Sequence, residues 1–418
     1  MVYENVIVGC GISGIMAAAM IKKKTDNFVI LEKTNCIGGV WETFSKDETC
    51  LQHNSCLYLL DSFFYVPGES VSTRYADKKF ICERLEKFIR YYQLEQHIIF
   101  SANVENFSES NNKVNIRYNV NGEQFKIVSE NLIICTGNLC IPRHKISESD
   151  KIVRYANIKN YKEFFADKKS VIVVGSGASG VEVCVHALEN GLQDVVMLYK
   201  DHLGFYFNGI ITEYMYTLLH ILPKETANHL FIKLQYVIAW CKGCRLPGYI
   251  GNNCNHIYPF SSHIIDAYNQ GHVTFLKNEG LSQKKMLKHC DVIVETVGFD
   301  NSLKQFNLEA KDLYNLNTRH PAYRKVFFVG LTKPNTGTVA YTSYILLRNI
   351  MEVIERNMYD IKSNVDDALF TPRLYLRYFH AMGLSMKPFV DIICFWIHSM
   401  IIKILDFIKR ISCKLFIN

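Results

Sequence analysis

The sequence predicts an α/β protein with two domains, each built around a parallel sheet. Two stretches carry this prediction, residues 6–31 and residues 171–199. Each stretch has an apolar strand, a Gly-x-Gly-x-x-Gly turn, an apolar helix and a second apolar strand. This order of elements is that of a Rossmann-like dinucleotide-binding unit. Because the unit occurs twice, 166 residues apart, the chain is expected to hold two dinucleotides, one in each domain.

In the first unit, there is a physical reason for a glycine at each of the three positions of the turn. Gly9 permits a tight turn, Gly11 lets the backbone approach a pyrophosphate, and Gly14 lets the helix pack closely on the strand. The phosphate would then lie at the positive end of the helix dipole, beside Ile12 and Ser13. Glu32 follows the second strand, where a carboxylate accepts hydrogen bonds from a ribose. A glycine-rich turn that binds no ligand is the structural alternative.

The second unit has the same turn and a different residue after its second strand. Lys200 follows that strand, and a cation attracts the 2′-phosphate that a carboxylate would repel. The second site therefore favours NADPH over NADH. Asp201 lies beside this lysine and weakens the inference, and a merely solvated Lys200 is the alternative. The residues expected at this phosphate are Gly175, Gly177, Ala178, Ser179 and Gly180.

The remaining elements follow from periodicity. Residues 79–92 have the apolar period of a helix, and residues 114–118 and 124–128 alternate around Asn121-Gly122 as a hairpin does. Apolar runs predict further strands, and the first of them ends at Thr136-Gly137. The further elements are strands over 132–135, 291–294 and 326–329 and helices over 214–222, 230–240 and 338–351.

The composition is that of a globular protein. The chain has 418 residues, room for two or three domains, and 49% of its residues are hydrophobic. The net charge is +7, of which residues 361–418 contribute +4, so the body carries no charge pattern for nucleic acid. We interpret the 14 cysteines, spread over a long chain, as reduced thiols. The first apolar run begins at residue 6 as a sheet strand, so no cleavable signal segment is expected.

The C-terminal residues differ from the body. Residues 389–400 are almost wholly apolar, and the segment after them has apolar residues on one helical face and mostly charged residues on another. The uncharged run over 392–402 is shorter than the roughly 20 residues that span a bilayer. We therefore expect residues 361–418 to form a helical tail whose residues 389–418 meet a membrane surface. Packing of this helix on the body or on a second subunit is the alternative.

Three motifs lie between these elements. Gly38-Gly39-Val40-Trp41 suits a backbone close to a cofactor, with a flat indole beside it, and the alternative is a turn followed by a core Trp. Asn54, in Leu-Gln-His-Asn-Ser, offers an amide on a loop. Cys241, Cys244, Cys254 and His256 have the composition of a zinc site without its spacing, so we expect free thiols and no metal.

With these residues in view, residues 3–350 resemble the flavin-containing monooxygenases. The first turn with Glu32 matches that family's FAD site, and the second turn matches its NADPH site. Gly39, Val40, Trp41, Thr136, Gly137 and Gly298 lie in motifs similar to those of the family. Asn54 falls where the family carries an Asn that contacts the flavin and the nicotinamide. The resemblance implies an FAD domain over 1–148 and 291–360, an NADPH domain over 149–290, and the tail.

By this resemblance, NADPH reduces FAD, and the reduced flavin captures O₂ as a C4a-hydroperoxide. One oxygen atom then passes to a small substrate with a nucleophilic nitrogen or sulfur, or to a carbonyl. Asn54 is the catalytic residue that the resemblance implies. The expected location is cytoplasmic, or peripheral on the endoplasmic reticulum or another internal membrane through the tail.

One motif departs from the family. Lys151, Val153 and Asn157 replace the Phe, Gly and His of the segment that precedes the second turn. Two alternatives therefore stay open. One is a membrane-associated flavoprotein that has lost turnover, or an NADPH oxidase. The other is a dithiol reductase that uses Cys241 and Cys244, although those cysteines follow the second turn instead of preceding it.

Overall fold

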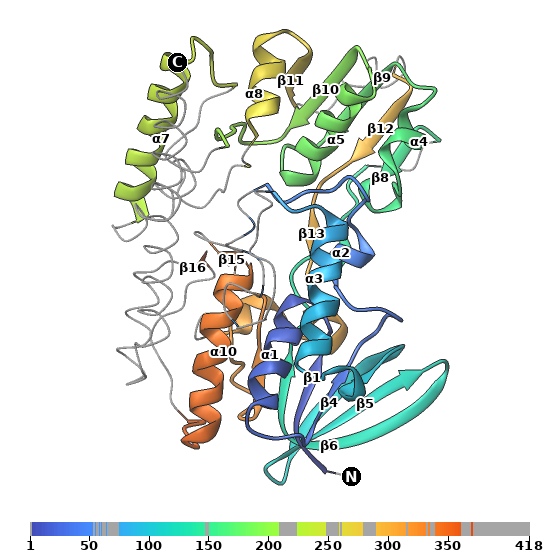
Figure 1. The fold of residues 1–418 in the computed structure, drawn as a ribbon, viewed down its shortest axis with the longest axis vertical. Helices are drawn as coiled ribbons and strands as arrows, with labels where there is room; N and C mark the ends of the chain where they lie inside the picture. The colour runs from blue at the N-terminus through green and yellow to red at the C-terminus, as the bar shows by residue number, and fades with distance from the viewer. Residues whose placement is uncertain are drawn as a thin grey trace, which may run out of the picture.

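The computed structural model describes the two glycine-turn units and most of the chain between and after them. The described residues are 2–52, 55, 58, 60, 64, 75–146, 150–208, 224–247, 259, 261–278, 290–314, 317–331, 333–334, 339–360 and 369–370. Figure 1 shows two lobes stacked along the long axis of the molecule. The first lobe contains both the beginning of the chain and residues 326–355, and the second lobe is formed by the residues between them.

The first lobe is built on a seven-stranded sheet of order β3-β2-β1-β6-β5-β4, with β14 also paired to β6. Strands β1, β2, β3, β6 and β14 run parallel, and β4, β5 and β6 form an antiparallel meander. The strands are β1 (Val2–Val8), β2 (Phe28–Leu31), β3 (Ile98–Ile99), β4 (Ala102–Ser110), β5 (Lys113–Val120), β6 (Glu123–Ile134) and β14 (Val326–Phe328).

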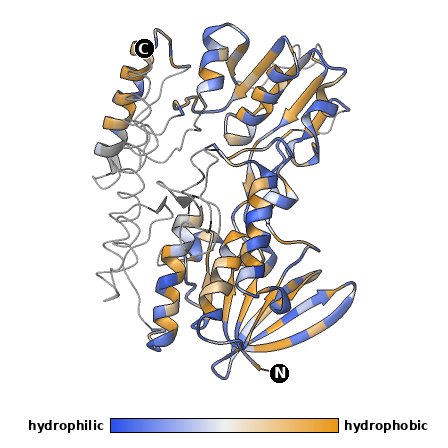
Figure 2. Cartoon of the chain, viewed as in Figure 1, coloured by the Kyte–Doolittle hydropathy of each residue, from blue (hydrophilic) through white to orange (hydrophobic). Residues whose placement is uncertain are grey.

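Helix α1 (Ile12–Lys22) lies inside the first lobe. Residues 12–21 are all buried, because the sheet covers one side of α1 and α10 (Val339–Glu355) packs on another. Figure 2 shows this helix as mostly apolar, whereas the outer meander alternates between apolar and polar residues. Helix α3 (Lys78–Tyr91) adds one buried apolar stripe, and Asp77 caps its first turn by accepting from the backbone N–H of Phe80. The short α2 (Val40–Thr43) follows the Gly38-Gly39 pair.

The second lobe is built on a five-stranded, wholly parallel sheet of order β11-β10-β9-β12-β8. Helices α4, α5 and α8 pack with it around a separate apolar core. Its strands are β8 (Ile152–Arg154), β9 (Ser170–Val174), β10 (Asp194–Tyr199), β11 (Val273–Lys277) and β12 (Val292–Glu295). Its helices are η4 (Tyr155–Asn157), α4 (Tyr161–Phe165), α5 (Ala178–Glu189), α7 (Lys224–Cys241) and α8 (Ser262–Asn269).

The two connections between the lobes run side by side. Strand β7 (Ile141–Pro142) leaves the first lobe and β13 (Phe299–Asp300) returns to it, and the two pair antiparallel. The ion pair between Arg143 Nε and Asp300 Oδ1, at 2.6 Å, holds them together. After β13 the chain passes through η5 (Ser302–Phe306) and η6 (Ala310–Asp312) before it enters β14.

Most elements expected from periodicity are present, with two differences in how they assemble. The strand expected over 132–135 and the second strand of the expected hairpin form one continuous strand, β6. Asn131 lies between the two expected strands and is buried, and its side chain has hydrogen-bond partners there: it donates to Glu4 O and accepts from the Tyr359 hydroxyl. The strand expected over 291–294 pairs as β12 with β9 and β8. The second lobe therefore extends past the boundary expected at residue 290.

The expected tail, residues 361–418, lies outside the described residues except for β16 (Leu369–Phe370). This short strand pairs parallel with β15 (Lys333–Pro334). The helix expected over 214–222 also lies outside them, whereas the helix expected over 230–240 is part of α7. Within the part of the chain that the structure describes, no helix combines the length and the apolar character needed to cross a bilayer.

Candidate cofactor-binding site

The first glycine turn leads directly from β1 into α1 and leaves no room for side chains. A Cβ on Gly14 would lie 1.9 Å from the carbonyl oxygen of Gly9, so only glycine fits there. Gly11 occupies the N-cap position of α1, and no side chain caps the helix. The first backbone N–H groups of the helix, at Ile12 and Ser13, therefore have no capping acceptor and point to where an anion would bind.

Glu32 lies at the end of β2 and turns its carboxylate toward this turn. Its Oε2 accepts from the backbone N–H of Cys10 at 2.6 Å, and its Oε1 accepts from the N–H and hydroxyl of Thr34, both at 2.8 Å. The residue is 6% exposed. A carboxylate offers about four acceptor positions, so a ribose hydroxyl at this site would still find an acceptor. The geometry fits the role expected from the sequence.

The paired glycines after Cys36 cover the first turn from another side. A Cβ on Gly39 would lie 3.0 Å from the Cα of Gly11, so the two backbones are in direct contact. Val40 begins α2 immediately afterwards. Trp41 is buried, and its indole Nε1 donates to the Tyr58 hydroxyl at 2.5 Å. This is the placement expected of a core Trp, and a contact between Trp41 and a cofactor stays a prediction.

A third wall of the site comes from the distant end of the chain. A Cβ on Gly330, which follows β14, would lie 2.9 Å from Ser13 Oγ and 3.8 Å from the Cα of Gly137. Ser13 Oγ in turn lies 2.8 Å from the hydroxyl of Ser343 in α10. Thr136 and Gly137, predicted from the sequence, follow the end of β6 here. Gly330 and Ser343 were not predicted as site residues. Gly330 follows an apolar strand, as Gly137 does, and this pattern could have indicated it; no sequence pattern indicates Ser343.

The second glycine turn repeats the first one in the other lobe. A Cβ on Gly180 would lie 2.1 Å from the carbonyl oxygen of Gly175. Gly177 is the N-cap of α5 and no side chain caps this helix either. Ala178 and Ser179 form its first turn, and Gly177 and Ala178 are exposed. Side chains cap α3, α4 and α8, whereas α1, α5 and the four-residue α2 have no side-chain cap, so the first N–H groups of α1 and α5 are left without a side-chain acceptor.

The neighbouring strand that each glycine turn packs against also has an equivalent position in the two lobes. A Cβ on Gly9 would lie 2.8 Å from the Cys135 oxygen, and a Cβ on Gly175 would lie 2.4 Å from the Thr296 oxygen. Each of these carbonyls belongs to the residue directly after a strand that pairs with the strand leading into the turn: β6 pairs with β1, and β12 pairs with β9. Gly298 follows the second of them, and its carbonyl accepts from the N–H of Arg143 on the connection between the lobes. The two units thus share the same arrangement of three strands and one helix.

Lys200 follows β10 and is exposed, with its side chain 77% accessible to solvent. Its ammonium lies 3.2 Å from Asp201 Oδ2. The structure therefore leaves Lys200 in reach of solvent and partly neutralised. This position is consistent with both readings of the sequence, a 2′-phosphate contact and a solvated lysine, so the contact stays a prediction.

One segment of the first lobe joins the two glycine turns. We call residues 44–52 the bridging segment. The short helix α2 links its start to Gly39, which touches Gly11, and at its far end Gln52 Nε2 donates to the carbonyl of Ala178 at 3.1 Å. Thr49 Oγ1 donates to Glu182 Oε1 in α5 at 2.6 Å. The two expected phosphate sites are therefore connected through a single short stretch of chain.

Some expected site residues lie outside the described residues or away from this arrangement. Asn54 lies outside them, as do Cys254 and His256. Cys241 and Cys244 are free thiols at the end of α7 and in the turn that follows. Among the residues that the structure describes, no group of three or more His, Cys, Asp or Glu side chains could hold a metal ion.

The thiols nearest to the first turn do not suit disulfide chemistry. Cys10 and Cys135 are both buried, and burial raises the pKa of each thiol far above its ordinary value. The nearby carboxylate of Glu32 raises the pKa of Cys10 further. A thiolate is the reactive form of cysteine, so neither residue is prepared to act as a redox nucleophile.

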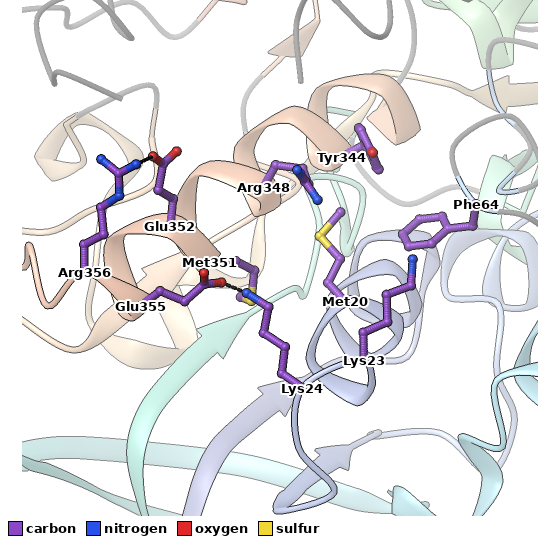
Figure 3. A pocket seen from close by; sticks show the side chains of 10 residues that line it. All are labelled: Met20, Lys23, Lys24, Phe64, Tyr344, Arg348, Met351, Glu352, Glu355 and Arg356. Atoms are coloured by element: carbon purple, nitrogen blue, oxygen red, sulfur yellow. Dashed lines mark ion pairs between the residues drawn. The ribbon is translucent and has the colours of Figure 1, made fainter. Parts of the chain in front are cut away.

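A pocket of about 280 Å³ lies at the far end of α1, away from both glycine turns. Figure 3 shows it between α1 and α10, with Lys23 and Arg348 pointing toward Met20 and Phe64, while Lys24 pairs with Glu355 and Arg356 with Glu352. Its lining includes no residue that the sequence predicted for a cofactor. The residues are Met20, Lys23, Lys24, Phe64, Tyr344, Arg348, Met351, Glu352, Glu355 and Arg356.

Comparison with known proteins agrees with this geometry. Residues 6–206 match the family described as pyridine nucleotide-disulphide oxidoreductase. The FAD-containing monooxygenase EthA of Mycobacterium tuberculosis is 29% identical over 208 residues, covering 47% of this chain and 42% of that protein. The indole-3-pyruvate monooxygenase YUCCA6 of Arabidopsis thaliana is 30% identical over 230 residues, covering 53% and 49%. The chain therefore spans about half the length of these relatives, or less.

Solved structures share the fold at low sequence identity. A steroid monooxygenase bound to NADP is similar with a TM-score of 0.61 and 16% identity, over 85% of this chain and 86% of that one. A flavin-containing monooxygenase from Stenotrophomonas maltophilia is similar with a TM-score of 0.57 and 14% identity, over 85% and 98%. The resemblance to flavin monooxygenases that the motifs indicate is confirmed by these sequence and structural relatives.

Proposed function

We propose that the chain is an NADPH-dependent flavin monooxygenase that binds FAD in the first lobe and NADPH in the second. It uses O₂ to oxygenate a small substrate at a nucleophilic nitrogen or sulfur, or at a carbonyl. The observation that carries the proposal is the pair of equivalent glycine turns, each opening an uncapped helix and joined to the other by the bridging segment. Two of the sequence relatives, EthA and YUCCA6, support it, since both are monooxygenases by name.

The first lobe fits FAD on its own chemistry. The N-terminus of α1 would hold the pyrophosphate, and Gly11 and Gly39 leave its backbone open to a close approach. Glu32 would accept from the ribose. A substitution at Gly330 would push against Ser13, so the wall opposite Gly39 is also made of backbone and small side chains. When bound, FAD would supply the redox chemistry: it would accept a hydride from NADPH and, once reduced, activate O₂.

The protein's own residues would bind and orient the cofactors and would exclude water from them. The N-terminus of α5 would hold the NADPH pyrophosphate, and Lys200 would attract its 2′-phosphate. We propose that Asn54 holds its amide against the flavin edge and the nicotinamide, as the resemblance implies. The aromatic residues Trp41 and Tyr58 close the interior beneath α2, so solvent is kept from that side.

The test is a spectrum and an oxygen balance on the purified full chain. After FAD is supplied, we expect flavin absorbance to remain with the protein through gel filtration and NADPH to bleach it faster than NADH. In air, with an amine, a thioether or a ketone, isotopically labelled O₂ should place one labelled oxygen atom in the product of one of these classes. A protein that retains no flavin after supplementation would overturn the proposal.

A flavoprotein that reduces O₂ without oxygenating a substrate is the second candidate. It is favoured by the segment before β9, where Asn157 stands at the position of the family's His and Lys151 Nζ donates to the carbonyl of Cys290. In the same experiment, this candidate predicts NADPH consumption matched by peroxide with all three substrate classes. Product formed in proportion to NADPH would exclude it.

A further inference from the structure

Glu182 gathers three hydroxyl groups from three different segments. Its Oε1 accepts from Thr49 Oγ1 at 2.6 Å and from the Tyr161 hydroxyl at 2.9 Å, and its Oε2 accepts from the Tyr155 hydroxyl at 3.0 Å. Tyr155 and Tyr161 belong to η4 and α4 of the second lobe, whereas Thr49 belongs to the first lobe. Glu182 itself lies in α5, one turn after Ala178. A charged acceptor with three donors is a strong and directional junction.

A buried cation completes this junction. The Lys46 ammonium lies 3.5 Å from the centre of the Tyr155 ring and donates to the carbonyl of Phe44. Lys46 is 2% exposed, and its backbone N–H donates to Thr49 Oγ1 at 2.8 Å. The hydroxyl of Thr49 thus accepts from the bridging segment and donates to α5. Burial lowers the pKa of Lys46 to about 8, and the negative charge of Glu182 offsets part of this shift.

The bridging segment links the two expected cofactor sites. At one end it follows α2, which begins directly after Gly39, and the backbone of Gly39 lies against Gly11. At the other end Gln52 Nε2 reaches the carbonyl of Ala178 in the second turn, and Gln52 O accepts from Asn208 Nδ2 at 3.2 Å. The bond between Thr49 and Glu182 lies between these two contacts. It is therefore placed to set how far the second turn stands from the first.

We propose that Glu182 is a positioning residue: by holding Thr49, it fixes α5 and the second glycine turn at the distance and angle that hydride transfer needs. This inference rests on the proposed function. Transfer of a hydride requires reacting atoms about 3–3.5 Å apart, and a misplacement of about 1 Å can lower the rate by about a hundredfold. Tyr161 bonds to the same carboxylate oxygen within one lobe, so it offers a matched control.

The experiment compares Thr49→Val with Tyr161→Phe in the full chain. Each variant removes one hydroxyl from the same Glu182 oxygen and keeps nearly the same shape, but only Thr49→Val removes a bond between the lobes. We expect Thr49→Val to slow anaerobic flavin reduction by NADPH about tenfold or more, with unchanged affinities for FAD and NADPH. We expect Tyr161→Phe to lower the melting temperature and to leave the reduction rate within about twofold of wild type.

A second readout needs no cofactor. The Lys46 amide is left out of this readout, because Thr49→Val removes its acceptor. Hydrogen exchange of the backbone amides in residues 47–52 should accelerate in Thr49→Val and stay close to wild type in Tyr161→Phe. Equal exchange in both variants, or an unchanged reduction rate in Thr49→Val, overturns the positioning role. If wild type binds no flavin or is not reduced by NADPH, the proposed function fails, and the exchange measurement still decides whether Glu182 holds the lobes together.

Discussion

Two neighbouring glycines of the second turn offer a way to separate ligand binding from folding. A methyl group added at Gly180 would lie 2.1 Å from the carbonyl oxygen of Gly175 and 3.1 Å from Thr296 Oγ1. A methyl group added at Gly177 would meet no heavy atom within 4 Å. The backbone of Gly177, with φ −84° and ψ −171°, is extended and acceptable to alanine. Gly180→Ala therefore strains the protein itself, whereas Gly177→Ala intrudes only on a ligand.

The expected magnitudes follow from these distances. A carbon–oxygen contact of 2.1 Å is about 1 Å too short, so Gly180→Ala must separate α5 from β9, and overpacking of this kind costs about 1–3 kcal/mol or more. That corresponds to a loss of roughly 2–10 °C in melting temperature if the second lobe unfolds as a unit of about 150–250 residues. Gly177→Ala should change the free energy of unfolding by less than about 1 kcal/mol, because the loss of the glycine cap and the stiffer unfolded chain oppose each other.

The assay measures melting temperature and NADPH affinity for both variants. If the pyrophosphate lies at the N-terminus of α5, Gly177→Ala should weaken NADPH binding about tenfold or more, or about 1.4 kcal/mol, with the melting temperature unchanged. FAD binding should be unaffected. Wild-type NADPH affinity in Gly177→Ala would refute the placement of the phosphate, and a stable Gly180→Ala would refute the steric reasoning.

Three further predictions address other parts of the site. Asn54→Ala should leave FAD bound and divert NADPH oxidation toward peroxide; an unchanged yield of product per NADPH contradicts its role. Glu32→Gln should weaken FAD binding about tenfold and lower the free energy of unfolding by about 1–2 kcal/mol, because the buried charged acceptor of the Cys10 N–H is lost; calorimetry of both quantities checks it, and unaltered FAD affinity argues against ribose binding. Burial lowers the pKa of Lys46 to about 8, so between about pH 8 and 10.5 the unfolded chain binds more protons than the folded chain, and the Lys46 contribution to stability rises with pH. The free energy of unfolding of wild type relative to Lys46→Met, measured by urea unfolding, should therefore increase by about 1–2 kcal/mol from pH 7.5 to 9.5. A difference that does not change with pH would contradict the burial of this amine.

The two glycine turns could be predicted from the sequence because their geometry is local. The spacing that brings Gly14 against Gly9 is repeated at Gly180 and Gly175, and both pairs are close in the sequence. The carboxylate of Glu32 follows its strand by one residue. In each case a short stretch of chain determines where the side chain or backbone must lie, so the residue pattern alone carries the information.

The rest of the site depends on contacts between distant residues. Gly330 and Ser343 reach Ser13 only because β14 pairs with β6 and α10 packs on α1. Thr49 and Glu182 are 133 residues apart, and neither belongs to a motif. The run over 291–294 reads equally well as a strand of either sheet, since a buried parallel strand is apolar on both faces. Its pairing with β9 is decided by tertiary structure.

The paired connections β7 and β13 have a consequence for the order in which the chain folds during synthesis. The second lobe is one continuous stretch that precedes β14 and α10 in the chain, so it can fold before these two elements leave the ribosome. The sheet of the first lobe stays incomplete until residues 326–355 emerge, because the edge of β6 that faces away from β1 lacks its partner β14 at residues 132–134. We therefore expect released chain fragments that end near residue 310 to contain a protease-resistant second lobe attached to an N-terminal region that is still cleaved.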